Sequence, residues 1–99
     1  MKCITLEKYI KKDIDDDDNK LMLGVLDINI WGSLSIIPEV CYDKNKFCIR
    51  IQYDAPLDYI TLSRILETIN LLTLEFKKPA LLTVKKYRRS TFYYICVDK

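Results

Sequence analysis

The sequence of 99 residues contains no histidine, only two glycines and only three prolines. The absence of histidine removes the commonest general base and metal ligand that works near neutral pH. The scarcity of glycine argues against a loop of backbone amides that cradles phosphate, and neither the P-loop pattern nor the dinucleotide-binding pattern occurs. We therefore expect a protein that is not an enzyme and that holds no cofactor and no metal.

Long apolar runs are also missing. No stretch approaches the ~20 residues that a membrane-spanning helix requires, and residues 1–7 lack the long uncharged segment of a secretory signal peptide. These absences predict a protein of the cytoplasm, or of the host cytoplasm if the gene is viral, that contacts no membrane.

The four cysteines, Cys3, Cys41, Cys48 and Cys96, are spread along the chain. In a cytoplasmic protein we expect reduced thiols that pack as small apolar residues. Cys41 and Cys48 flank a predicted turn and should face each other on adjacent strands. The close pairs typical of zinc sites are absent, which disfavours a metal or redox site.

Acidic and basic residues are concentrated in different segments, although the net charge is only +2. Residues 13–18 carry five acids, and residues 77–90 carry six cations and no acid. The acidic segment lacks the spaced carboxylates and the glycine of a calcium loop. It is predicted to be a solvated loop over residues 13–20.

Apolar periodicity predicts the secondary structure. Thr5 can cap a helix over residues 5–14 whose apolar side chains share one face: Leu6, Tyr9, Ile10 and Ile14. A strand over the same residues is the alternative. Strands are predicted over residues 21–31, over 34–42 with Pro38 at an edge or bulge, and over 47–53 after a turn at 43–46.

The second half of the chain gives the clearest helix. Residues 54–58 supply caps and a proline suited to a helix start. The helix then continues to about residue 78, with a core face of Leu62, Ile65, Leu66, Ile69, Leu72 and Phe76. Residues 80–87 and 91–97 form a last hairpin. The prediction is one α+β domain over residues 1–99, in the order α-β-β-β-α-β-β, with an antiparallel sheet packed against one long amphipathic helix.

The tip of the last hairpin is the first candidate binding site. It has two cations on each side of one aromatic residue: Lys85, Lys86, Tyr87, Arg88 and Arg89. Cations attract phosphates and aromatic rings stack on bases, so the hairpin suits nucleic acid or an acidic protein surface. The alternative is that edge strands carry cations simply to deter aggregation.

The long helix offers a second candidate, a stripe opposite its core face that contains Ile60, Arg64, Leu71 and Leu74. A surface helix with one buried face does not need a second apolar stripe. The stripe is therefore either covered by the N-terminal segment or available to a partner or a second copy of the chain. Trp31 is a further candidate anchor, with burial in the core as its alternative.

These features favour a non-enzymatic module that binds another protein. Its narrower form is an inhibitor of a host defence enzyme, encoded by a phage or a mobile element. The alternative function is nucleic-acid binding through the basic hairpin, and a homodimer is the alternative partner.

Overall fold

The computed structural model describes residues 1–11, 23 and 26–99. The predicted acidic loop over residues 13–20 lies outside these described residues, as does most of the first half of the strand predicted over 21–31.

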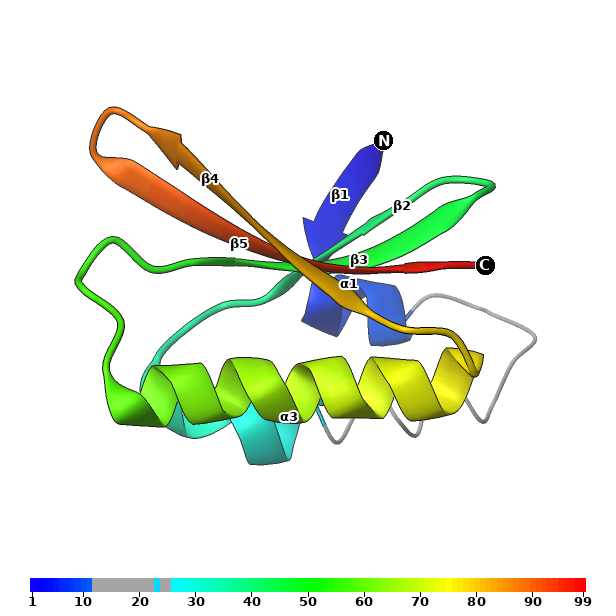
Figure 1. The fold of residues 1–99 in the computed structure, drawn as a ribbon, viewed down its shortest axis with the longest axis horizontal. Coiled ribbons are helices and arrows are strands. Elements are labelled where there is room, and N and C mark those ends of the chain that lie inside the picture. Colours follow the sequence, from blue (N-terminus) through cyan, green and yellow to red (C-terminus); the bar gives the residue numbers. More distant parts are fainter. Residues whose placement is uncertain (12–22, 24–25) are drawn as a thin grey trace.

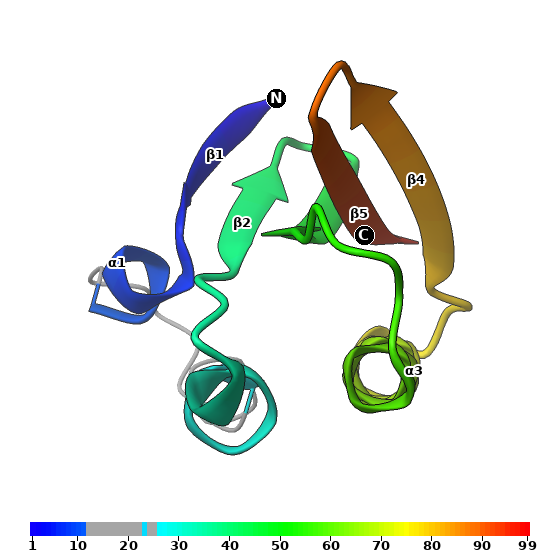
Figure 2. The same ribbon diagram turned by 90° about the vertical axis from the view of Figure 1, so that its left-hand side faces the viewer.

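The described chain forms an antiparallel five-stranded sheet with one long helix packed against it, as predicted (Figure 1). The sheet order is β1-β2-β3-β5-β4, and every neighbouring pair is antiparallel. Figure 2 shows α3 on one side of the sheet beside the helical segment η1–η2, with α1 next to β1. The elements in chain order are β1 (Lys2–Thr5), α1 (Leu6–Lys11), η1 (Leu26–Trp31), η2 (Gly32–Leu34), β2 (Glu39–Tyr42), β3 (Lys46–Gln52), α3 (Tyr59–Phe76), β4 (Leu81–Tyr87) and β5 (Ser90–Asp98).

The N-terminal segment contains both of the structures that its sequence allowed. Residues 2–5 form β1, and the predicted helix begins directly after it, with the Thr5 hydroxyl accepting a hydrogen bond from the Lys8 amide at 3.3 Å. The Leu6 amide donates to the carbonyl of Pro38 at 2.9 Å, which ties the junction to the start of β2. The predicted helix starts at Thr5 and no element is predicted over residues 2–4, so the predicted order lacks β1.

The strand predicted over residues 21–31 is wrong for its second half. Residues 26–31 form η1, a helical turn with π-type hydrogen bonds. Its buried side chains include Leu26, Ile30 and Trp31, and the spacings of four and five residues from Leu26 are those of a helical face rather than of a strand. The next strand, β2, is also shorter than predicted. It starts at Glu39, and Pro38 lies just before it rather than at an edge or bulge.

The β2–β3 hairpin and the strand β3 are confirmed. The Asp43 carboxylate accepts the amides of Asn45 and Lys46 at 2.7 and 2.9 Å, and these bonds hold the pKa of Asp43 below its ordinary value. Phe47, Ile49 and Ile51 are buried on the face of the sheet that α3 covers, so the predicted alternation is confirmed.

The start of α3 also follows the prediction. Asp58 is the N-cap, and its carboxylate accepts the Thr61 amide at 2.7 Å. The Tyr53 hydroxyl donates to the same carboxylate, and these two hydrogen bonds lower the pKa of Asp58. The helix ends at Phe76, and the capping residue Lys77 after it adopts a left-handed conformation with φ of 56°.

The core face of α3 is rotated from the one that the apolar pattern predicted. The buried positions are Thr61, Ile65, Thr68 and Leu72, whereas Leu62 and Leu66 are 40% and 52% exposed. The buried indole of Trp31 explains the rotation, since its Nε1 donates to the Thr68 hydroxyl at 3.2 Å. An indole N–H buried without an acceptor would be costly, so Thr68 has to face η1.

We expect Thr68→Val to lower the free energy of unfolding by about 1–3 kcal/mol, because it leaves the Trp31 N–H without its acceptor. Thr68→Ser keeps the hydroxyl and removes only a methyl group, so it should be the less damaging change. Urea titration followed by the fluorescence of Trp31, the single tryptophan, measures both. A serine variant that is less stable than the valine variant would show that volume matters here and the hydrogen bond does not.

Candidate functional site

Two surfaces that lie beside the last hairpin stand out, one on each face of the sheet. Cross-strand partners share a face, so the register of β4 and β5 assigns each side chain. Leu82 and Val84 face the α3 side with their buried partners Ile95 and Tyr93. Lys85 faces the opposite side, which we call the outer face.

The first surface is the α3–β4 patch, formed by Leu62 and Leu66 of α3 and by Leu82 and Val84 of β4. Leu82 and Val84 are 39% and 47% exposed although they sit on the covered side of the sheet. Figure 1 shows the reason: β4 starts near the C-terminal end of α3 and rises away from the helix.

The two leucines of α3 lie on the side of the helix that faces β4. Thr73 marks that side, because its hydroxyl accepts the amide of Ala80, just before β4, at 3.0 Å. Leu66 is seven residues before Thr73 and therefore on the same helical face. Thr68 lies towards η1 instead, where it meets Trp31. The patch therefore joins apolar side chains from two elements along one border of the molecule.

The second surface is the outer-face cluster, in which cations lie over aromatic rings. The Lys85 ammonium is 4.9 Å from the ring centre of Tyr94, and the Arg50 guanidinium is 5.4 Å from that of Phe92. The Tyr87 ring meets Phe92 edge to face, with centroids 5.8 Å apart. Arg50 also pairs with Glu39 at 2.8 Å. The cluster can therefore offer both positive charge and aromatic surface to a ligand.

The predicted basic hairpin is only partly one surface. Lys85 and Tyr87 join the outer-face cluster, while Lys86 points to the α3 side. Arg88 and Arg89 form the exposed two-residue turn, and Arg88 takes a left-handed φ of 48°. Turns of this kind favour Asn or Gly at the left-handed position, so Arg88 is not the residue that the turn conformation prefers.

The predicted stripe on α3 does not form a continuous surface. Ile60 and Leu74 are 55% and 75% exposed, but Leu71 packs against the core and Arg64 pairs with Glu67 at 3.1 Å. Trp31 is fully buried, so it belongs to the core and not to an exposed anchor. Sequence reasoning missed Leu62 and Leu66 as surface residues, because it placed both on the core face of the helix. It also missed the contacts of Arg50 with Phe92 and Tyr94, because the β3–β5 pairing was not predicted.

The four cysteines form one row across the outer face. The register pairs Cys3 with Cys41, Cys41 with Cys48, and Cys48 with Cys96. The expected juxtaposition of Cys41 and Cys48 is confirmed, but the expected reduced thiols are not. Disulfides join Cys3 to Cys41 and Cys48 to Cys96, and the Cα atoms of each bonded pair are 4.1 Å apart.

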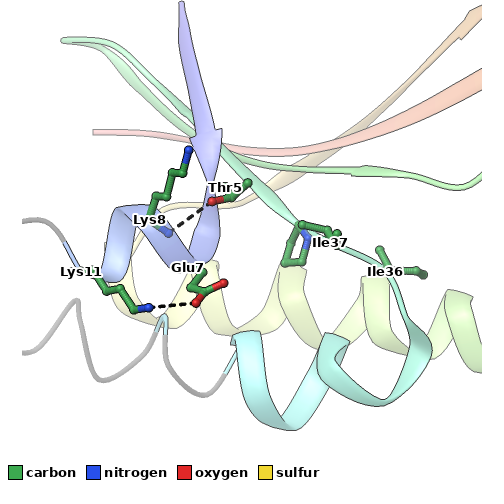
Figure 3. Close-up of a pocket in the computed structure, with 7 residues that line it drawn as sticks. Thr5, Glu7, Lys8, Lys11, Ile36 and Ile37 are labelled. Atoms are coloured by element: carbon green, nitrogen blue, oxygen red, sulfur yellow. Dashed lines mark hydrogen bonds and ion pairs between the residues drawn. The ribbon is translucent and has the colours of Figure 1, made fainter.

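A hollow of about 490 Å³ lies between α1 and the segment that leads into β2 (Figure 3). Its apolar wall is Ile36, Ile37 and Pro38, and its charged wall is on α1. The Glu7 carboxylate there pairs with Lys11 Nζ at 2.9 Å, and this hydrogen bond lowers the pKa of Glu7. A carboxylate bound in this way is a poor general base near neutral pH.

The chain matches no protein-family model, and no curated protein or solved structure is detectably similar to it. Among the described helices, none is long and apolar enough to cross a membrane. Within the same residues, no three potential metal-ligating side chains gather into one site.

The disulfides yield a stability prediction. They close loops with sequence separations of 38 and 48 residues, and the chain-entropy model assigns about 4 kcal/mol to each. We expect a reductant to lower the unfolding midpoint in urea strongly. In the Cys48→Ala/Cys96→Ala variant, the reductant should cause only the part of this decrease that comes from the Cys3–Cys41 disulfide. A variant that lacks all four cysteines is the control, since reductant should not change its midpoint. Four reactive thiols in protein purified without reductant would contradict the pairing.

Proposed function

We propose that this chain is a non-enzymatic protein-binding module whose contact surface is the α3–β4 patch together with the open edge of β4. The observation that carries the proposal is that all seven residues of β4 are exposed, although the strand places leucine and valine on the covered side of the sheet. An edge strand offers main-chain donors and acceptors that another extended chain can satisfy. Apolar side chains beside such an edge favour a polypeptide as the ligand.

The narrower form, an inhibitor of a host defence enzyme, is one use of this surface and is motivated by the small size of the chain. The redox state of the four cysteines indicates the cellular compartment in which the chain works. Disulfides persist in oxidising compartments, whereas four thiols would fit the expected cytoplasm. Alkylation of free thiols in intact cells, followed by a count of modified cysteines, distinguishes these settings.

We expect a tagged copy of the chain to retain a near-stoichiometric protein from a lysate of the cells that express it. Leu66→Glu should abolish this retention, because it places a charge in the centre of the α3–β4 patch. The matched control is Leu74→Glu, which makes the same change on the same helix outside the patch and should keep the partner. Mass spectrometry with intensity-based stoichiometry measures retention, and circular dichroism checks folding.

The two leucine variants also compare the α3–β4 patch with the stripe predicted from the sequence. Loss of the partner with Leu74→Glu but not with Leu66→Glu would place the contact on the stripe and refute the patch. Absence of any stoichiometric protein would count against the binding function as a whole.

The outer-face cluster supports a second candidate function, binding of single-stranded nucleic acid. The supporting observation is the set of cations within about 5 Å of aromatic ring centres, beside the two arginines of the turn. Phosphates would meet Lys85, Arg88 and Arg89, while bases would stack on Tyr87 and Phe92.

For this candidate we expect fluorescence anisotropy to detect binding of a labelled oligonucleotide at low salt, with affinity that falls steeply as salt rises. Arg88→Glu/Arg89→Glu should reduce affinity by at least about tenfold and flatten the salt dependence. The charge-matched control is Lys44→Glu/Lys46→Glu, on the other hairpin, which should change affinity little. Equal losses in the two variants would indicate attraction by net charge rather than a site.

A further inference from the structure

We infer that the partner on the open edge of β4 is a second copy of this chain, paired antiparallel with Val84 on the twofold axis. This inference rests on the proposed function and names its partner. It follows from which main-chain groups face the edge, from the distribution of charge along β4, and from the position of the two leucines of α3.

The hydrogen bonds of β5 identify the free groups of β4. The Tyr53 amide donates to the Thr91 carbonyl at 3.0 Å, so the main chain of Thr91 faces β3. Main-chain groups alternate in direction along an antiparallel strand, and Tyr93 and Ile95 therefore face β3 as well. Their partners across the ladder point the opposite way, towards the open edge. These partners are Lys86, Val84 and Leu82.

The three outward positions are symmetric about Val84. In an antiparallel pair centred there, Val84 exchanges both main-chain hydrogen bonds with Val84 of the second copy. Leu82 likewise pairs with Lys86 of the other copy, on both sides of the axis. A twofold contact requires this self-complementarity, because each copy must offer the same surface. The register uses every outward residue of the strand.

The charge of β4 selects the antiparallel arrangement. Its first residues, 81–84, are neutral, and its cations, Lys85 and Lys86, stand near the end beside the Arg88–Arg89 turn. A parallel copy would place lysine beside lysine and turn beside turn, which is repulsive. In the antiparallel register Lys86 meets Leu82 and Lys85 meets Thr83, so the two turns point to opposite ends.

The helices complete the contact. Val84 lies four residues beyond Ala80, which is bonded to Thr73 near the end of α3. Four strand residues span about 13 Å, which brings Val84 level with the part of α3 that carries Leu62 and Leu66. The twofold axis through Val84 therefore brings these leucines of both copies to the same side of the new ten-stranded sheet. The site is incomplete without the second copy, because the leucines and the strand edge are otherwise open to solvent.

Sedimentation velocity of the purified chain tests this inference. We expect twice the mass of the chain across the micromolar range, and the mass of one chain for Leu66→Glu. Val84→Pro should also give a monomer, because proline removes an outward N–H while leaving the β4–β5 ladder intact. Leu74→Glu is the control and should remain a dimer. Circular dichroism and the emission of Trp31 show that each variant is folded.

A mixing experiment tests the register. Thr83 and Lys85 of opposite copies form a closely spaced pair in this arrangement, and the four native cysteines are bonded to one another. Thr83→Cys protein mixed with Lys85→Cys protein should form a disulfide-linked dimer on oxidation, and neither variant alone should do so. Self-linking of the Thr83→Cys variant would place the axis at Thr83 and overturn the register.

The outcomes separate this inference from the proposal beneath it. A wild-type monomer at every concentration, or a dimer that survives both Leu66→Glu and Val84→Pro, overturns the second copy as partner. If the lysate experiment then recovers a different protein whose retention depends on Leu66, the binding function stands with another occupant. If neither experiment finds a partner, both fail.

Discussion

The indole of Trp31 fixes where the long helix lies, and the exposed surfaces follow from that position. The ring is completely buried and has one polar atom, which donates to Thr68 of α3. A buried donor without an acceptor costs more than a typical hydrogen bond contributes, so this contact constrains the rotation of the helix as well as its place. It turns Thr61 and Thr68 inward and leaves Leu62 and Leu66 on the border beside β4.

The same contact explains why the covered side of the sheet is shared unequally. η1 and α3 lie side by side beneath the sheet (Figure 2), and the hydrogen bond between Trp31 and Thr68 holds them together. Two helical segments held in this way cover the central strands, where Ile49, Ile51 and Ile95 are fully buried. They leave all seven residues of β4 exposed, because β4 twists away from α3 as sheets do across successive strands. Leu82 and Val84 are therefore exposed because of where α3 and η1 lie beneath the sheet, although both side chains are apolar.

Local patterns predicted the elements whose own residues decide their structure. β3 alternates between apolar and other residues, the Asp43 turn supplies its own side-chain acceptor, and α3 starts at a capping aspartate. Prediction failed where tertiary contacts decide. Residues 26–31 could have alternated as a strand, but burial of Trp31 against α3 selects a helical turn. The apolar stripe of α3 is wide enough to rotate, and only the partner of Thr68 shows which leucines remain outside.

The candidate sites also contain features that local sequence predicts and features that tertiary contacts decide. The cations of the last hairpin were visible in the sequence, but the ring contacts of Lys85 and Arg50 depend on β3 lying next to β5, which no local pattern reveals. The cysteine row depends on the same pairings. The turn at residues 43–46 predicts by itself that Cys41 faces Cys48, but Cys3 and Cys96 join them only when β1 and β5 are placed in register. The prediction of a cytoplasmic protein with reduced thiols was therefore made without the pairing of the cysteines, which bears most strongly on the cellular compartment.

Side chains alternate between the two faces of the sheet along β4, so the two candidate surfaces use different residues of the strand. Leu82, Val84 and Lys86 present their side chains to the α3 side and their main-chain groups to the open edge, whereas Lys85 and Tyr87 belong to the outer face. A strand added at the edge would cover the main-chain groups of Leu82, Val84 and Lys86. It would extend the outer face without covering the side chains of Lys85 and Tyr87. In the antiparallel register, the outer-face clusters of two copies would lie on one continuous sheet, on either side of the axis at Val84. Dimerisation would then place two cation-and-ring clusters on the same side of the molecule, and a single strand of nucleic acid long enough to reach both would bind more tightly than one cluster allows.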